Sequence, residues 1–108
     1  MKERRLKTRS GETITLFQAD EGFWCCPVCG SPEFNDPPYL DEGTPSFEMC
    51  SCGFEFGFDD DPGASKEAVD GVVNNWARWR TKIIEATPMS SIRYDRLRTN
   101  LRNIGVEI

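Results

Sequence analysis

The chain has 108 residues, of which 38% are hydrophobic and 29% are charged, and this composition suits one small globular domain. It contains no histidine, which excludes Ser-His-Asp catalysis, Cys-His catalysis and any histidine-ligated metal site within a single copy. No apolar run approaches the roughly 20 residues that cross a bilayer, and no apolar segment follows the basic start of the chain. We therefore expect a cytoplasmic protein that makes no membrane contact.

Charge is divided into three blocks along the chain. Residues 1–9 carry five basic side chains and one acid, residues 10–65 carry twelve acids and no Lys or Arg, and residues 66–108 carry eight basic side chains and five acids. The acidic middle block disfavours contact with phosphate and suits a partner with a basic surface. The alternative is that the basic ends fold back on the middle block and neutralise it within the chain.

The first half of the chain predicts short strands separated by loops. Residues 1–10 lack apolar periodicity and predict a mobile basic arm, whereas the alternating, β-branched residues 12–18 predict a strand. The density of Pro, Gly, Asn and Asp in residues 30–45 predicts irregular structure. Residues 46–49 are strand-like, and the alternation in residues 54–58 predicts a strand that carries three rings on one face: Phe54, Phe56 and Phe58.

The last third of the chain predicts two helices. Ser65 has the chemistry of an N-cap, and apolar residues recur after it at helical spacing to about residue 85. Thr87 ends this helix, because a residue that precedes proline is pushed out of the α region. A second helix is expected to begin near Ser90 or Ser91, with Gly105 as its C-cap.

The five cysteines favour metal binding over disulfides in a chain expected to be cytoplasmic. Cys26-Pro27-Val28-Cys29-Gly30 is a Cys-x2-Cys knuckle, whose spacer lets two thiolates converge on one ion and whose glycine permits the tight turn. A second pair, Cys50-Ser51-Cys52-Gly53, follows after a typical spacing but is one residue shorter. We expect a structural Zn²⁺ held by Cys26, Cys29, Cys50 and Cys52, with Cys25 able to substitute for one of them. The alternative is that some cysteines are only small buried side chains.

The cysteine segments resemble a known family. Residues 26–30 and residues 45–55, Pro45-Ser46-Phe47-Glu48-Met49-Cys50-Ser51-Cys52-Gly53-Phe54-Glu55, are similar to the two knuckles of a zinc ribbon, and more narrowly to the bacterial cysteine-rich domain family named for its CPCC motif. Residues 59–68 and Asn75-Trp76 are also similar to that family, so the resemblance covers about residues 26–80. The chain departs from the family in its shortened second pair and in placing its double cysteine before the knuckle.

The resemblance implies a small bacterial domain without an established enzymatic activity, and related small acidic proteins imply an immunity role against a toxin. Together with the predicted elements, it indicates an α+β fold in which a zinc-ribbon-like β module of short antiparallel strands is followed by two C-terminal α-helices packed on it. We divide this single domain into the basic arm at residues 1–10, the β module at residues 11–61 and the helical part at residues 62–108.

The first functional hypothesis is a non-enzymatic zinc-binding protein that acts through protein–protein interaction. Its partner would be an unknown protein with a basic surface, and an immunity or antitoxin role is one form of this hypothesis. The candidate contacts are the acidic turn and one tryptophan: Asp59, Asp60, Asp61 and Trp79. The alternative for Trp79 is that it packs the first helix onto the β module.

Two other hypotheses belong to different classes. A nucleic-acid-binding zinc ribbon would use the basic helical part, which contains Arg78, Arg80, Lys82, Arg93, Arg96, Arg98 and Arg102, but the net charge of −5 and the pI of about 4.7 oppose it. A thiol redox protein would use Cys26 and Cys29. The pair is followed by a proline-rich loop and not by the helix N-terminus that lowers the thiol pKa in such enzymes, which opposes this third hypothesis.

Overall fold

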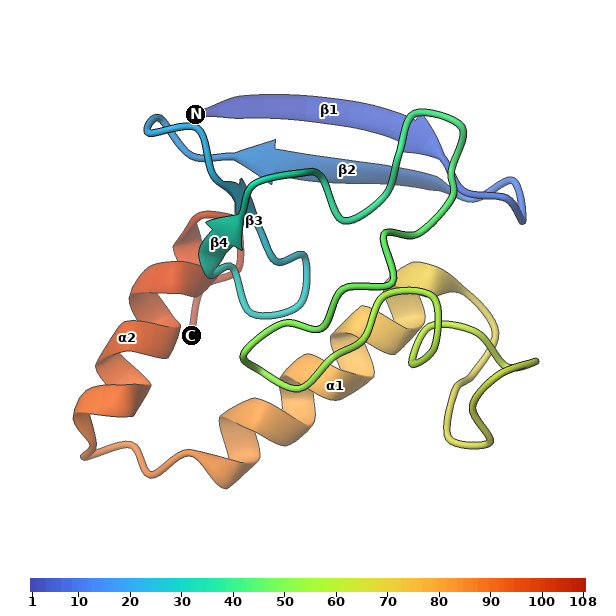
Figure 1. The fold of residues 1–108 in the computed structure, drawn as a ribbon. Coiled ribbons are helices and arrows are strands. Elements are labelled where there is room, and N and C mark those ends of the chain that lie inside the picture. Colours follow the sequence, from blue (N-terminus) through green and yellow to red (C-terminus); the bar gives the residue numbers. More distant parts are fainter.

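The computed structural model describes residues 1–108 and contains four strands followed by two helices (Figure 1). The strands β1 (Lys2–Lys7), β2 (Thr13–Gln18), β3 (Trp24–Cys25) and β4 (Pro32–Phe34) form one antiparallel sheet in the order β1-β2-β3-β4. The helices are α1 (Val72–Ala86) and α2 (Ile92–Arg102). The predicted α+β class, with short antiparallel strands before two C-terminal helices, is confirmed. Neither helix has the length and apolar character that crossing a membrane requires.

The prediction of a mobile arm at residues 1–10 is wrong, because β1 forms there. It pairs with β2 over its whole length, from Lys2 opposite Gln18 to Lys7 opposite Thr13. Most side chains of this outer strand are charged, so the sequence shows no strand pattern. Its one buried apolar side chain is Leu6. The charged side chains also suit an edge strand, since charge there discourages pairing with another chain.

The basic end of the chain neutralises part of the acidic middle block. The guanidinium of Arg4 lies 3.2 Å from a carboxylate oxygen of Asp41, and the terminal amine of Met1 pairs with Asp20. Arg4 also lies 4.8 Å from the centroid of the Trp24 ring. The fold-back that the charge pattern allowed is therefore present in the structure.

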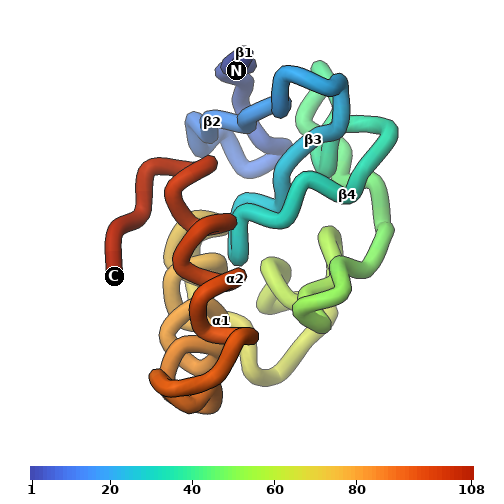
Figure 2. Tube along the Cα trace, turned by 90° about the vertical axis from the view of Figure 1, so that its left-hand side faces the viewer, coloured from blue at the N-terminus to red at the C-terminus, as the bar shows by residue number.

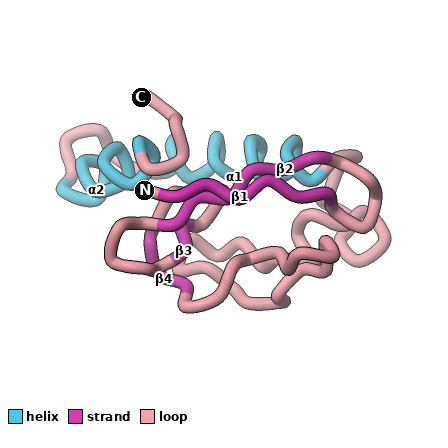
Figure 3. Tube along the Cα trace, turned by 90° about the horizontal axis from the view of Figure 1, so that it is seen from above, coloured by secondary structure: helices cyan, strands magenta, loops and turns pink.

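The molecule has three layers, and an aromatic core lies between them. The helices line one side of the molecule, the long irregular segment between β4 and α1 lines the opposite side, and the strands lie between and above them (Figures 2 and 3). The ring of Phe56 lies 5.5 Å from that of Phe34 and 5.8 Å from that of Tyr39, measured between centroids. The Tyr39 ring in turn lies 5.8 Å from that of Trp76 on α1. These rings join the sheet, the irregular segment and α1.

The two strands predicted at residues 46–49 and 54–58 are absent. The pairing there is reduced to one isolated bridge between Met49 and Glu55, and the backbone turns after it. Phe54 and Phe56 are fully buried as the alternation predicts, but Phe58 is 43% exposed because the amide of Phe58 closes a turn on the carbonyl of Glu55.

The predicted first helix begins later than expected, at Val72 and not after Ser65. Ser65 is buried, and its hydroxyl accepts a hydrogen bond from the amide of Glu67 within a turn. The free amides of α1 are instead capped from a distant segment, since the carboxylate of Glu12 accepts from the amides of Val72 at 2.7 Å and Val73 at 3.0 Å. A carboxylate at this position also favours the helix dipole.

The boundaries between the helices agree with the sequence. Thr87 is the C-cap of α1, and Ser91 is the N-cap of α2, where its hydroxyl accepts from the amide of Tyr94 at 3.2 Å. The helix α2 ends at Arg102 and its C-cap is Asn103, not Gly105 as predicted. Gly105, with a φ of 78°, lies in the turn that follows, where its amide donates to the carbonyl of Arg102.

Candidate metal centre

Two segments of the chain bring four thiols to one point. Knuckle 1 (residues 26–30) contributes Cys26 and Cys29, and knuckle 2 (residues 50–53) contributes Cys50 and Cys52. The four Sγ atoms all lie within 4.8 Å of one another, with 3.6 Å between those of Cys29 and Cys50 and 4.0 Å between those of Cys26 and Cys52. Four sulfurs bound at 2.3 Å around a tetrahedral zinc ion would lie about 3.8 Å apart. The predicted ligand set is therefore brought together with a spacing that fits one metal ion.

The shortened second pair closes in the same way as the first. In knuckle 1 the amide of Cys26 donates to the carbonyl of Ser31, and that of Gly30 donates to the carbonyl of Cys26. In knuckle 2 the amide of Cys50 donates to the carbonyl of Phe54, and that of Gly53 donates to the carbonyl of Cys50. Each link spans one residue fewer than its counterpart. The missing spacer residue is thus absorbed by a tighter turn, and both thiols still face the cluster.

Backbone amides support one sulfur in each knuckle. The amide of Val28 lies 3.4 Å from the Sγ of Cys26, and the amide of Cys52 lies 3.4 Å from the Sγ of Cys50. Such N–H groups stabilise a thiolate, which is the form of cysteine that binds metal. Both glycines that end the knuckles adopt a left-handed backbone, with φ of 82° for Gly30 and 92° for Gly53.

The four thiols contact one another in pairs, Cys26 with Cys52 and Cys29 with Cys50. Hydrogen bonds from neighbouring thiols lower the pKa of Cys29, and those from Cys26 and Cys52 lower the pKa of Cys50 to about 7. Burial raises the pKa of Cys26. A cluster that contains a readily formed thiolate among protonated thiols releases protons when a metal ion binds.

The helices hold both knuckles through their backbone carbonyls. On α1, the Nε of Arg80 donates to Val28 at 2.7 Å, and another guanidinium nitrogen donates to Pro27 at 2.7 Å. Burial lowers the pKa of the Arg80 guanidinium, while the nearby thiolates of knuckle 1 oppose that shift. After α2, the side-chain amide of Asn103 donates to Gly30 at 3.0 Å, and on α1 the indole of Trp79 donates to Cys52 at 3.1 Å.

A carboxylate lies beside knuckle 2. The hydroxyl of Ser51 donates to Glu33 at 2.7 Å, and the Sγ of Cys50 lies 3.1 Å from the same carboxylate oxygen. Glu33 comes from β4, so this contact ties the sheet to the second knuckle.

Cys25 lies outside the cluster, and the structure does not place it as a substitute ligand. It is buried at the end of β3, and successive residues of a strand point to opposite faces. Burial raises the pKa of its thiol, with a contribution from the carboxylate of Glu21. Cys25 is therefore a natural control for the four clustered cysteines.

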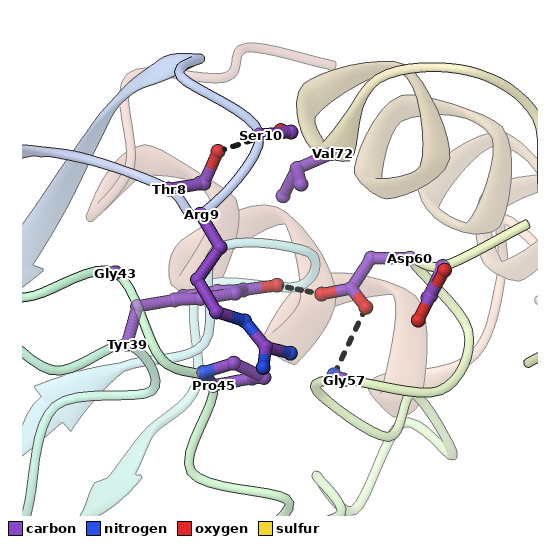
Figure 4. Close-up of a pocket in the computed structure, with 10 residues that line it drawn as sticks. Thr8, Arg9, Ser10, Tyr39, Gly43, Pro45, Gly57, Asp60 and Val72 are labelled. Carbon is purple, nitrogen blue, oxygen red and sulfur yellow. Dashed lines mark hydrogen bonds between the residues drawn. The ribbon is translucent and has the colours of Figure 1, made fainter. Parts of the chain in front are cut away.

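Two of the predicted partner contacts have internal roles. Asp60 is buried, where its carboxylate accepts from the hydroxyl of Tyr39 and from the amide of Gly57 beside a pocket of about 290 Å³ (Figure 4). Burial raises the pKa of Asp60. Trp79 is half-buried, with its ring edge-on to Phe54 at 5.5 Å. Asp59 accepts from the amide of Glu55, so among these candidates only Asp61 is fully exposed.

The cations proposed for nucleic-acid binding are divided between two roles. Arg80 is half-buried against knuckle 1, and the guanidinium of Arg98 lies 5.4 Å from the centroid of the Tyr94 ring. The remaining cations are exposed: Arg78, Lys82, Arg93, Arg96 and Arg102. Of these, Arg102 forms an ion pair with Glu107.

No family model, curated protein or solved structure matches the chain. Sequence reasoning missed the supporting roles of Glu33, Arg80 and Asn103, because each acts on a knuckle that is distant in the chain and leaves no local pattern.

Proposed function

We propose that the four-cysteine cluster binds one Zn²⁺, that this ion stabilises the fold, and that the protein acts without catalysis by binding another protein. The observation that carries the metal proposal is the convergence of four Sγ atoms within 4.8 Å, from two knuckles with matched backbone closures. Four thiolates fill the tetrahedral shell of zinc and leave no position for a substrate, which is the arrangement of a structural site.

Apart from its buried rings, the irregular half of the fold has little regular structure to hold it. The strands β3 and β4 contain two and three residues, and residues 35–71 contain no helix or strand. A structural zinc ion contributes an apparent 10–16 kcal/mol in small modules, which is about the whole stability of a typical domain. Loss of the ion should therefore release both knuckles together with the helix contacts made by Arg80 and Trp79.

Metal analysis combined with circular dichroism tests this proposal. Protein purified under reducing conditions should contain one zinc ion per chain and should lose its fold when zinc is chelated. Single serine substitutions at Cys26, Cys29, Cys50 and Cys52 should each lower zinc content, whereas Cys25→Ser should retain it. A metal-free chain with unchanged circular dichroism would overturn the proposal, as would equal zinc content in all five variants.

The partner that we propose is a protein with a basic surface. Residues 10–65 contain no Lys or Arg, and large apolar side chains are exposed within this block: Phe47, Met49 and Phe58. Acidic surroundings attract a cationic partner, and exposed aromatic and methionine side chains supply contact area. Immunity toward a basic toxin, as the resemblance to the CPCC family implies, is one such function.

Affinity capture at low and high salt tests the partner proposal. We expect a basic protein to be retained at low salt and released as salt is raised, because the interaction is screened. Recovery of no basic protein at low salt would contradict the proposal. A nucleic-acid role has one supporting observation, the exposed cations of α2, and an electrophoretic shift at low salt would favour that role instead.

A further inference from the structure

The metal centre is open to solvent on one side. A cleft of about 340 Å³ is lined by Cys29 of knuckle 1, by Cys52 of knuckle 2, and by α2. Cys52 is only half-buried, whereas the other three clustered cysteines are buried. The cleft therefore gives molecules in solution a path to two thiols of the cluster, although four protein ligands fill the coordination shell of a structural zinc ion.

Two unpaired cations lie in the lining of this cleft. Arg93 and Arg96 are exposed on α2, and neither forms an ion pair. Asp95 lies between them in the sequence but does not line the cleft. The carboxylate nearest to the cluster, Glu33, contacts Cys50, which is also outside the lining. The lining of the cleft therefore holds two cations and no carboxylate, and the nearest acidic contact is Glu33, which accepts a hydrogen bond from Ser51 of the lining.

The two arginines change how the metal centre interacts with anions. A zinc ion with four thiolates carries a net charge of about −2, which by itself repels anions. Two guanidiniums beside the cleft offset this repulsion and attract carboxylates, for which the planar guanidinium is the preferred partner. Ser31 and Asn100 add hydrogen-bonding groups to the same lining.

We infer that the cleft admits small anionic chelators, molecules with carboxylates and a nitrogen or sulfur donor, and that zinc is exchanged through it. This inference rests on the proposed zinc site. Carboxylates of the chelator would pair with Arg93 and Arg96, and its donor atoms would take up the zinc as the four Zn–S bonds break, first those to Cys52 and Cys29 in the cleft and then those to Cys26 and Cys50. The released thiolates take protons from water, and no electrons are transferred. Neutral chelators gain nothing from the two arginines.

The rate of zinc removal from the zinc-loaded protein tests this inference. The probes are EDTA, which is anionic, and TPEN, which is neutral, and the zinc that remains bound to the protein is measured at intervals after rapid desalting from low-salt buffer. The double variant R93Q/R96Q should release zinc to EDTA about tenfold more slowly than the unaltered protein, because electrostatic attraction raises association rates by at least that factor. Its release to TPEN should be unchanged, and high salt should remove the difference between the proteins.

The matched control is R5Q/K7Q, which removes two exposed cations of β1 that lie outside the cleft lining. This control should release zinc to EDTA at a rate close to that of the unaltered protein. Equal slowing by both double variants, slowing toward both chelators, or no slowing by R93Q/R96Q would each overturn the inference while the zinc site stands. A protein that binds no zinc would overturn the proposed function itself. Circular dichroism and zinc content of each variant confirm that it folds and is loaded.

Discussion

The guanidinium of Arg80 fastens α1 to knuckle 1, with its Nε 2.7 Å from the carbonyl oxygen of Val28. A second nitrogen of the same group reaches the carbonyl of Pro27 at 2.7 Å. Two carbonyls of a metal-binding turn are thus satisfied by one side chain from a helix far along the chain. The helical part therefore positions the cysteines as well as covering the core.

Replacing this group should weaken both the fold and the metal site. Arg80→Met keeps much of the side-chain length but leaves two carbonyls without donors, and hydrogen bonds from a charged group contribute about 2 kcal/mol each. We expect urea denaturation of the zinc-loaded protein to show a loss of at least about 2 kcal/mol, together with weaker zinc binding. Arg78→Met is the control, since Arg78 is exposed on the same helix and its one side-chain hydrogen bond, to the carbonyl of Glu67, lies outside both knuckles. An equal effect of both substitutions would contradict the proposed role of Arg80 in holding knuckle 1.

Gly30 lies where knuckle 1 meets α2, and a side chain there has no room. A Cβ atom at this position would lie 1.9 Å from the carbonyl oxygen of Asn100. Gly22 also has a positive φ, of 101°, but its Cβ would meet no atom within 4 Å. Gly22→Ala should therefore report only the backbone cost, about 1 kcal/mol.

Gly30→Ala should cost about 2 kcal/mol more than Gly22→Ala, because the helix must move away from the knuckle. Thermal or urea unfolding measures the difference directly. Near-equal stability of the two variants would show that α2 does not pack on knuckle 1 as closely as described.

The sequence predicts the clustering of the four cysteines and the start of α2 because short local patterns mark them. The two closely spaced cysteine pairs do converge in the structure, and Ser91 is the N-cap of α2. The strand β1 is missed because its pairing with β2 is hidden by charged side chains. The start of α1 is missed because its cap, Glu12, comes from the other end of the chain.

The burial of Asp60 could not be predicted from the sequence for a similar reason. Nothing in the run Asp59-Asp60-Asp61 marks its middle member as buried. That burial depends on the hydroxyl of Tyr39, which reaches Asp60 from a distant loop. An acidic turn and a buried hydrogen-bonded carboxylate have the same local sequence, and only the tertiary structure separates them.

Phe47 is the one residue other than glycine with a positive φ, which is 63°. Its side chain is 57% exposed, so burial gives little compensation for the strained backbone. Phe47→Gly should be more stable than Phe47→Ala by about 1 kcal/mol, because glycine adopts this conformation without steric cost. Both variants lack the ring, so the comparison isolates the backbone, and urea midpoints measure it. An alanine variant as stable as the glycine variant would contradict the left-handed conformation.

Zinc binding should weaken as the pH falls. The ligands must be thiolates in the folded, metal-bound state, whereas thiols of an unfolded chain are protonated at neutral pH. Neighbouring thiols lower the pKa of Cys50 to about 7 in the metal-free protein, but burial raises the pKa of Cys26, so binding releases protons. The stability due to zinc is therefore present at high pH and lost as the pH falls.

The apparent affinity for zinc should drop roughly tenfold per pH unit for each proton released. Zinc competition titrations across neutral pH measure the slope, and a flat profile would contradict thiolate ligation.

The central claim is that both knuckles, including the shortened one, bind the same zinc ion. X-ray absorption at the zinc edge of the zinc-loaded protein tests it most directly. The account predicts four sulfur neighbours at about 2.3 Å and no nitrogen or oxygen in the shell. A shell with two or three sulfurs completed by oxygen would contradict it, because at least one cysteine of the cluster would then be outside the site.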